Sequence, residues 1–248
     1  MQEEIKQYWE KATPMNFKEE KWTYEQKRKF RYDLQDYMHD VFEFDKYDGK
    51  IVLDIGCGAG IDSMEFARNG AEVWPIDITE NAVNLTKQLS VEAGYPMAVQ
   101  RYNGVDLPFC RSMIDAIFSY GVLHHVPEID NLMDEIARVL KPGGKFMAMV
   151  YNRDSLLFAH SILHRGLDEG EPLDYIKLAS RYSERNLGCP YTKCYTKQEA
   201  LEYFSRYFKD VTVSVHYNVI DLVHERKVKI NIPDKYELGW HLVVKGMK

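Results

Sequence analysis

A glycine-rich turn after a short apolar run is the part of the sequence best suited to hold a ligand. Val52-Leu53-Asp54-Ile55 leads directly into Gly56-Cys57-Gly58-Ala59-Gly60. Glycines at such a turn let the backbone approach a ligand closely. Turns that bind a dinucleotide pyrophosphate normally have the spacing G-x-G-x-x-G, whereas this turn has G-x-G-x-G and follows an acidic residue. The difference favours a ligand without a pyrophosphate.

A second acidic residue agrees with this interpretation. Asp77 ends the next apolar run, where a carboxylate in a doubly wound fold accepts hydrogen bonds from both hydroxyls of a ribose. The alternative is that the glycines only make a tight turn from strand to helix and that Asp77 only caps the following helix. Because two independent features agree, we expect a nucleoside ligand.

Candidate catalytic residues follow the later apolar runs. His124 and His125 come after a run that ends at Ser119. Tyr151 and Asn152 leave the next run at the same edge of the expected sheet. Ligands of open α/β folds bind at this carboxyl edge, and an imidazole with an unperturbed pKa near ~6.5 suits proton abstraction. We predict His124, His125 and Tyr151 as catalytic residues, with neither histidine preferred; the alternative is that the histidines only shape the loop.

Two further groups of side chains have the chemistry of a metal or metalloid site. His160 and His164 are one helical turn apart, but no glutamate follows His160 in the pattern of zinc hydrolases. A surface or pocket-wall pair is therefore favoured, and no metal is predicted. Cys189 and Cys194, with Cys110, would offer three thiolates to arsenite. Their spacing is not that of a usual metal site, and isolated cysteines are more often small buried hydrophobic residues.

Alternating strands and helices are expected to position these residues. Apolar runs alternate with segments of helical periodicity, which predicts a doubly wound, Rossmann-like, seven-stranded and mostly parallel sheet. Thr196 and Glu199 form a capping box, and Lys141-Pro142-Gly143-Gly144 ends the preceding helix. The predicted strands are 51–55, 71–77, 97–102, 114–119, 145–151, 211–216 and 239–245, and the predicted core helices are 62–68, 81–93, 129–140 and 196–207.

Composition disfavours several classes of protein. Hydrophobic residues make up 45% and charged residues 28% of the chain, as in an ordinary globular protein and unlike a disordered or fibrous one. The formal net charge of −6 disfavours nucleic acid as a partner. Basic residues between Lys18 and Arg31 are interleaved with glutamates, which predicts a solvated helix face in preference to a phosphate-binding patch.

The sequence also predicts a cytoplasmic protein that does not enter a membrane. Residues 1–10 lack the apolar region of a secretion signal, and no apolar run approaches the ~18 residues that cross a bilayer. The four scattered cysteines predict reduced thiols in a chain of this length.

Several motifs together resemble the class I S-adenosylmethionine-dependent methyltransferases. They are Val52 to Gly60, Leu107-Pro108-Phe109, Gly121-Val122-Leu123-His124-His125 and Arg138 to Gly144. The subgroup most similar to them is the ubiquinone/menaquinone-biosynthesis type, or methyltransferase type 11. The resemblance is strong over residues 48–152, weaker over the terminal strands, and says little about 1–40 or 152–195. It implies S-adenosylmethionine as the cofactor and S-adenosylhomocysteine as the product.

The resemblance also implies roles for residues at matching positions. Asp54, Gly56 and Gly58 would surround the methionine part of the cofactor, in a turn that also holds Cys57 and Gly60. Ser119 would offer its backbone carbonyl to the ammonium group of the cofactor.

The nucleoside would lie beyond the second strand. The resemblance implies that Asp77 holds the ribose and that Ile78 lies against the adenine. The family commonly has an acidic residue six positions before the Phe of the Leu-Pro-Phe motif, where it meets the adenine amino group, but this sequence has Asn103. An amide oxygen can also accept from that group, and Gly104 and Asp106 leave the local register open.

The function expected from these features is transfer of a methyl group to an O or N atom of a small molecule. The aromatic content of 13% favours an aromatic or apolar acceptor. Alternatives are a non-catalytic S-adenosylmethionine-binding module and a methyltransferase acting on RNA, protein or arsenite; the glycine spacing disfavours an NAD oxidoreductase. The acceptor, the pathway and the choice between monomer and homodimer stay open. We expect an N-terminal helical lid (1–48), a cofactor-binding core (49–151), an inserted substrate cap after the fifth strand (152–195), and a C-terminal helix with the last two strands (196–248).

The N-terminal lid is rich in aromatic residues. Tyr8, Trp9, Trp22 and Tyr32 could present aromatic faces to the cationic sulfonium of the cofactor, although plain packing is the favoured role.

Overall fold

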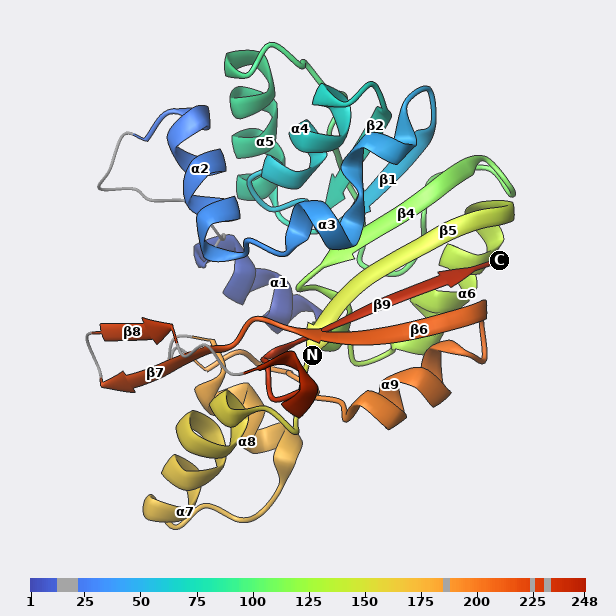
Figure 1. Cartoon of the computed structure of the whole chain (residues 1–248). Coiled ribbons are helices and arrows are strands. Elements are labelled where there is room, and N and C mark those ends of the chain that lie inside the picture. The colour runs from blue at the N-terminus through green and yellow to red at the C-terminus, as the bar shows by residue number, and fades with distance from the viewer. Residues whose placement is uncertain (13–21, 185–187, 224–225, 230–232) are drawn as a thin grey trace.

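The computed structural model describes residues 1–12, 22–184, 188–223, 226–229 and 233–248 (Figure 1). The strands are β1 (Ile51–Ile55), β2 (Glu72–Asp77), β3 (Gln100–Arg101), β4 (Ile114–Tyr120), β5 (Leu140–Tyr151), β6 (Lys209–His216), β7 (Val219–Val223), β8 (Arg226–Lys229) and β9 (His241–Met247). The α-helices are α1 (Gln2–Lys11), α2 (Tyr24–Leu34), α3 (Met38–Phe42), α4 (Ile61–Arg68), α5 (Glu80–Glu92), α6 (Ile129–Val139), α7 (Arg165–Asp168), α8 (Tyr175–Tyr182) and α9 (Lys197–Phe204). Further helical turns are η1 (Phe44–Tyr47), η2 (Leu123–His125), η3 (Phe158–His164, a π-helix) and η4 (Asp234–Tyr236).

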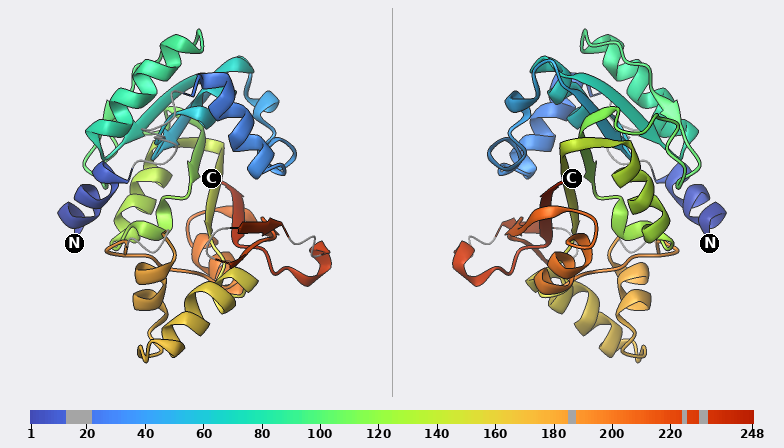
Figure 2. Two further views of the ribbon diagram at one scale, coloured as in Figure 1. Left: turned by 90° about the vertical axis from the view of Figure 1, so that its left-hand side faces the viewer. Right: turned by 90° about the vertical axis from the view of Figure 1, so that its right-hand side faces the viewer.

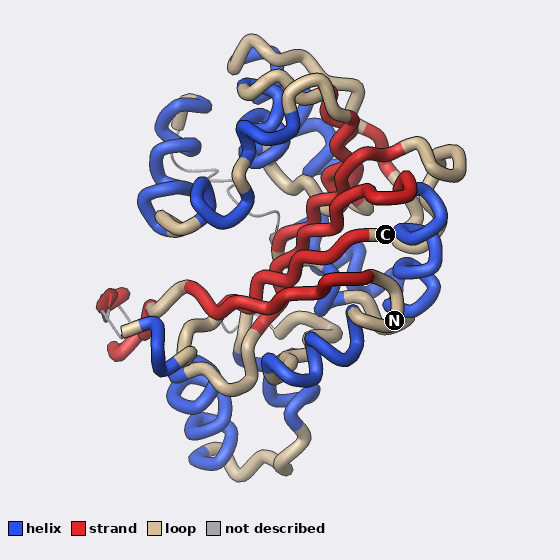
Figure 3. The backbone as a smooth tube through the Cα atoms, turned by 45° about the vertical axis from the view of Figure 1, so that its right-hand side comes forward, coloured by secondary structure: helices blue, strands red, loops and turns tan. Residues whose placement is uncertain are grey.

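One sheet of seven strands organises the molecule, in the order β3-β2-β1-β4-β5-β9-β6. The pairs from β3 to β5 are parallel, whereas β9 runs antiparallel to both of its neighbours. Figure 3 shows the strands as a central layer with helices on both faces. The predicted doubly wound, mostly parallel sheet is confirmed. No helix of the described segments is both long and apolar enough to cross a membrane.

The two faces of the sheet pack against different helices. On one face, Phe42 of α3 and Phe66 of α4 pack on Phe118 of β4, with ring centroids 5.0 Å and 5.2 Å from that of Phe118. On the other face, Phe204 of α9 packs on Phe146 of β5. Burial on both faces explains why the strands are continuous apolar runs. The candidate site residues lie at the carboxyl edge of this buried sheet.

The segment 141–144 follows the end of a helix as predicted, but it lies within a strand and does not precede one. Helix α6 stops at Val139, and β5 already starts at Leu140. Ile114 pairs with Leu140 but Ala116 pairs with Lys145, so 141–144 bulges out of the ladder between β4 and β5. The predicted helix end at about 140 agrees with α6 to one residue, whereas the predicted strand start at 145 is too late, because pairing with β4 continues on both sides of the bulge.

Other boundaries differ less. The predicted strand 97–102 is reduced to Gln100–Arg101, an exposed pair at the edge of the sheet where only β2 is available for pairing. The capping box of Thr196 and Glu199 is confirmed, but α9 ends at Phe204 and not at 207. The hairpin of β7 and β8 has no counterpart among the predicted elements.

Residues 152–195 leave the sheet and return to it at one point. Asn152 forms a parallel bridge with Tyr195, and the N–H of Arg153 donates to the Tyr195 carbonyl at 2.8 Å. Between them, η3, α7 and α8 pack around Phe158, Ile162 and Leu178. Figure 2 shows these helices extending away from the sheet as a separate lobe.

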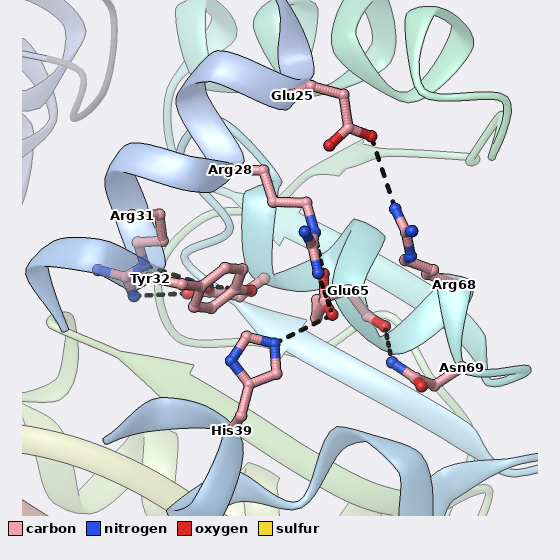
Figure 4. A network of polar contacts seen from close by, with 9 residues as sticks. Glu25, Arg28, Arg31, Tyr32, His39, Glu65, Arg68 and Asn69 are labelled. Carbon is pink, nitrogen blue, oxygen red and sulfur yellow. Dashed lines mark hydrogen bonds and ion pairs between the residues drawn. The ribbon is translucent and has the colours of Figure 1, made fainter. Parts of the chain in front are cut away.

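The two arginines of α2 are paired with carboxylates of α4, which corrects the prediction of a solvated face at these positions, whereas Lys29 is exposed as predicted. Arg28 donates two hydrogen bonds to the Glu65 carboxylate of α4, at 2.6 and 2.8 Å. Arg31 donates to Asp62 at 2.6 and 3.1 Å. Figure 4 shows this network, with His39 also reaching Glu65. The pairs fasten α2 onto α4; Lys18 and Lys21 lie outside the described residues.

Candidate functional site

A cavity of about 830 Å³ lies at the carboxyl edge of β1, β2 and β4. Its wall combines the glycine turn after β1, the end of β2, the segment around 101–108, the loop 120–127 and one side of α1. These segments are far apart in the sequence, and the order of the strands brings them together. A cavity of this size is typical of a small-molecule or cofactor site.

The glycine turn presents bare backbone to this cavity. Gly58 has φ +56°, and a Cβ placed on it would meet no atom within 4 Å. Gly56 has φ +77°, and a Cβ there would lie 2.2 Å from Cγ2 of Val122. Both glycines line the cavity. Gly56 is thus required by packing, whereas Gly58 leaves open space on the cavity side where a ligand can approach.

Asp77 is tied to the glycine turn and to the start of α5. Its Oδ2 accepts from the Gly58 N–H at 3.0 Å, and its Oδ1 accepts from the Thr79 N–H and hydroxyl at 3.0 and 2.9 Å. Thr79, and not Asp77, caps α5 by accepting from the Ala82 N–H. Burial raises the pKa of Asp77, and these donors only partly offset the effect.

Asp54 lies behind the turn and not on the cavity wall. It is 2% exposed, and the Ser63 hydroxyl donates to its carboxylate. Burial raises its pKa to about 7, although the Ser63 hydrogen bond acts in the opposite direction. The predicted residues Cys57, Gly60 and Ser119 are also placed behind the wall, since none of them belongs to the described cavity lining.

These residues behind the wall hold the turn in shape. The Cys57 thiol lies 3.6 Å from the Thr86 hydroxyl, and a Cβ on Gly60 would lie 2.4 Å from Cγ2 of Thr86. The Ser119 hydroxyl donates to the Ile55 carbonyl at 3.0 Å.

The loop after β3 uses Asn103 for its own structure. The Asn103 side-chain oxygen accepts from the N–H groups of Val105 and Asp106, at 3.0 and 2.8 Å, and its Nδ2 donates to Asp106 Oδ2 at 2.6 Å. Both lone pairs of the amide oxygen are therefore in use. Asn103, Gly104 and Asp106 all line the cavity. Asp106, which the sequence left open as an alternative register, is the carboxylate of this loop that can reach a ligand.

Helix α1 closes one side of the cavity, and a carboxylate holds it there. Glu10 accepts from the backbone N–H groups of Glu80 and Asn81, at 3.0 and 2.9 Å, in the first turn of α5. A negative charge is stabilising at a helix N-terminus. Trp9 lines the cavity, with its ring centroid 5.0 Å from that of His125.

The two predicted histidines occupy different environments. His125 lines the cavity, whereas His124 is fully buried behind it, with its ring centroid 3.9 Å from that of Tyr151. Burial holds the pKa of His124 well below its usual range. Burial also acts to lower the pKa of His125, but its contacts with Cys189 and Glu184 outweigh this and raise that pKa to about 10.

Glu184 of the insertion joins these residues, and the sequence had offered no signal for it. Its Oε1 lies 3.6 Å from Nε2 of His125 and accepts from the Tyr151 hydroxyl at 2.6 Å. Tyr151 is thus brought next to the histidines but does not belong to the described cavity lining. Burial raises the pKa of Tyr151 well above its usual range, and the Glu184 carboxylate adds to the effect.

The exposed histidine pair and Cys110 lie outside the described cavity lining, whereas the Cys189 thiol lies 3.5 Å from Nδ1 of His125. His160 and His164 are both exposed on η3, with parallel rings 6.2 Å apart. Cys110 is exposed whereas Cys189 and Cys194 are buried, an arrangement that gives no support to a shared thiolate site.

Known proteins match the segment that carries the glycine turn, Asp77 and His125. Residues 53–148 match the family model described as a methyltransferase domain. The chain is 34% identical over 116 residues to the ubiquinone biosynthesis O-methyltransferase of Xanthomonas axonopodis pv. citri, covering 46% of this chain and 48% of that protein. It is 38% identical over 94 residues to the biotin biosynthesis bifunctional protein BioHC of Cellvibrio japonicus, covering 38% of this chain and 18% of that protein. The chain spans about half the length of the ubiquinone-biosynthesis relatives that it matches.

Solved structures share the fold over most of the chain. A SAM-dependent methyltransferase from Methanosarcina mazei superposes with a TM-score of 0.62 at 21% identity, covering 84% of this chain and 96% of that one. A possible histamine N-methyltransferase from Thermotoga maritima superposes with a TM-score of 0.61 at 15% identity, covering 98% of this chain and 99% of that one. At these identities the likeness establishes the fold.

Proposed function

We propose that this chain, whose residues 53–148 match a methyltransferase domain, is a class I enzyme that transfers a methyl group from S-adenosylmethionine to an O or N atom of a small molecule. One observation carries the proposal: the glycine turn, Asp77 and His125 all border a single cavity of about 830 Å³. The volume suits a nucleoside cofactor together with an acceptor.

The cofactor would lie along the wall formed by β1, β2 and the loop after β3. Gly56 and Gly58 would face its methionine part, Asp77 its ribose, and Ile78 its adenine. The Asp106 carboxylate would accept from the adenine amino group, in place of the Asn103 amide oxygen. Asp54, Cys57, Gly60 and Ser119 would act as positioning residues that hold this wall in shape.

The acceptor would occupy the other side of the cavity. The lining here includes the aromatic residues Trp9 and Tyr120 and the apolar residue Val126. Aromatic faces also favour a nearby sulfonium cation. The Xanthomonas relative is an O-methyltransferase by name, so a hydroxyl on an aromatic or apolar molecule is the acceptor that we propose to test first. Residues 152–195 would cover it as a substrate cap.

His125 is the proposed catalytic residue. Of the three predicted candidates, only His125 belongs to the described cavity lining. His124 and Tyr151 would hold the His125 ring in position from the protein interior. A hydroxyl acceptor must lose a proton on methylation. Because the pKa of His125 is raised to about 10, the His125–Glu184 pair would take that proton only after His125 has passed its own to the Glu184 carboxylate. S-adenosylmethionine itself supplies the reactive methyl group when bound, so the chain has mainly to align the acceptor and exclude water.

The test is formation of S-adenosylhomocysteine from S-adenosylmethionine with a panel of hydroxylated aromatic compounds and a matched panel of amines. Turnover that requires both cofactor and acceptor, and that falls by roughly 10²–10⁴ in His125→Asn, supports the proposal. Binding of the cofactor without turnover on either panel would instead support a non-catalytic binding module.

A further inference from the structure

The cluster formed by His124, His125 and Glu184 lies just behind the cavity wall. One nitrogen from each histidine and one carboxylate oxygen of Glu184 all lie within 4.8 Å of one another. The cluster joins the loop after β4 to the insertion, so no pattern of sequence spacing indicates it.

His124 is an unusual residue for a protein interior. Its side chain is fully buried, and neither Nδ1 nor Nε2 has a hydrogen-bond partner among the described residues. A neutral imidazole carries one N–H donor and one acceptor. Buried polar groups are normally satisfied, and each unsatisfied one needs an explanation. A ligand that accepts an imidazole lone pair would provide one.

His125 is oriented as a metal ligand is. Its Nδ1 lies 3.0 Å from the carbonyl oxygen of Tyr191, which places the ring hydrogen on Nδ1. Nε2 faces Glu184 Oε1 at 3.6 Å without a hydrogen bond, and its lone pair becomes available to a metal ion that displaces the proton held there by the raised pKa of His125. Histidines that bind metals almost always donate from the other ring nitrogen to a carbonyl or carboxylate in this way.

Glu184 is held in place by a second contact. The Tyr151 hydroxyl donates to its Oε1 at 2.6 Å, and the carboxylate side chain is only 16% exposed. A hydrogen-bonded carboxylate beside two imidazole nitrogens is a donor set found in catalytic zinc sites, which have three protein ligands and one open position.

We propose that His124, His125 and Glu184 bind a divalent transition metal ion of the zinc type. Zinc lies about 2.0–2.2 Å from nitrogen and oxygen ligands, so tetrahedral ligands are roughly 3.3 Å apart. The separation of 3.6 Å between His125 Nε2 and Glu184 Oε1 is already close to this. The mixed imidazole and carboxylate donors favour zinc over magnesium or calcium, which prefer all-oxygen sites.

This inference also bears on the acceptor, a step that rests on the proposed function. Because His125 borders the cavity, the open position of the metal could take the acceptor oxygen and lower its pKa. With Nε2 bound to the metal, His125 would act as a ligand, and the metal would replace it as the group that activates the hydroxyl. The metal would then favour a hydroxyl over an amine, since an amine needs no such activation.

The experiment uses the full chain after treatment with a chelator and removal of that chelator. Zn²⁺ is titrated by calorimetry, and Co²⁺ is followed by its visible absorption, which reports coordination by the protein without reference to activity. We expect one ion per chain in the wild type and binding weakened by more than about tenfold in Glu184→Gln. Glu184→Gln is a mild change because its amide oxygen can still accept from Tyr151.

The matched control is the double variant His160→Asn with His164→Asn, which removes the exposed pair on η3 and should bind like the wild type. Thermal unfolding without metal checks that each variant is folded. The proposal would be overturned if the wild type bound no metal, or if binding were lost in the control and kept in Glu184→Gln. Absence of binding by the wild type would leave His125 and Glu184 as an ordinary ion pair. Affinity for S-adenosylhomocysteine, measured on the same samples, tests the proposed function separately.

Discussion

The Asp77 carboxylate accepts a hydrogen bond from the backbone N–H of Gly58, at 3.0 Å. This contact joins the end of β2 to the glycine turn after β1, so the two features that indicate a nucleoside ligand form one unit. The carboxylate fixes the turn from within the protein while both residues border the cavity. The site is therefore largely formed before a cofactor arrives.

Replacement of Gly58 by alanine should reduce cofactor affinity beyond its effect on stability. An alanine at φ +56° costs about 1–2 kcal/mol in backbone strain, and its methyl group would enter the cavity. Gly94→Ala is the matched control, because Gly94 has φ +80°, open space around its Cβ position, and no part in the described cavity lining. The two variants should unfold at similar urea concentrations, but only Gly58→Ala should bind S-adenosylhomocysteine more weakly. Equal affinity in both would place the cofactor elsewhere.

Asp106 should recognise the adenine amino group. We expect Asp106→Ala to lose about 1.5–3 kcal/mol of binding free energy, as for a hydrogen bond to a charged group. The wild type should discriminate against the hypoxanthine analogue of S-adenosylhomocysteine, which lacks the amino group, whereas Asp106→Ala should bind both ligands alike. Calorimetry with the two ligands measures this difference; unchanged discrimination in the variant would exclude the role.

Glu10 should control release of the cofactor. Its carboxylate accepts from two N–H groups at the start of α5 and holds α1 against the cavity. Loss of such a cap costs about 1 kcal/mol, so Glu10→Ala should release S-adenosylhomocysteine roughly fivefold faster in stopped-flow measurements. Glu4→Ala removes an exposed carboxylate of the same helix and serves as the control. Equal release rates in the two variants would show that α1 does not act as a lid.

Asp54 should make the free protein less stable as pH rises. Its carboxyl pKa is about 7 in the folded chain against an ordinary value of 3.8, so the folded state keeps a proton that the unfolded state has already lost. The stabilisation is complete below about pH 4 and declines by about 1.4 kcal/mol per pH unit up to about pH 7. Urea unfolding at pH 5 and pH 8 should show this loss in the wild type but not in Asp54→Asn.

Asp115→Asn is the control for this prediction. A Lys141 hydrogen bond outweighs burial and lowers the pKa of Asp115. This carboxylate therefore changes the free energy of unfolding only at acid pH, and its replacement should not alter the difference in stability between pH 5 and pH 8. A wild-type difference equal to that of Asp54→Asn would contradict the raised pKa of Asp54.

The parts of the site that lie on consecutive elements could be predicted from the sequence. Strand runs, the glycine turn and Asp77 carry local patterns, and the parallel order of the strands brings them to one edge. The predicted histidines also reach this edge, but only the structure separates His125 at the cavity from His124 behind it. Burial of a side chain in a loop depends on packing from distant segments, which local periodicity does not encode.

The remaining parts depend on contacts between distant segments. Glu184 meets His125 only because the insertion folds back over the loop after β4. Glu10 meets Asn81 across a similar distance in the chain. Arg28 likewise pairs with Glu65 of another helix, although the sequence had predicted that it faces solvent. A charged side chain at helical spacing looks the same in a sequence whether its partner is water or another helix.

The most direct test of a cofactor site at the glycine turn and Asp77 is thermal unfolding with and without S-adenosylhomocysteine. At about 100 times its dissociation constant the ligand should add about 2.7 kcal/mol to the free energy of unfolding, or roughly 5–10 °C in Tm for a chain of this size. Asp130→Asn, which alters a carboxylate of α6 outside the described cavity lining, should show the same rise, and Asp77→Asn should show little or none. No rise in the wild type at saturating ligand, or an equal rise in Asp77→Asn, would contradict the account.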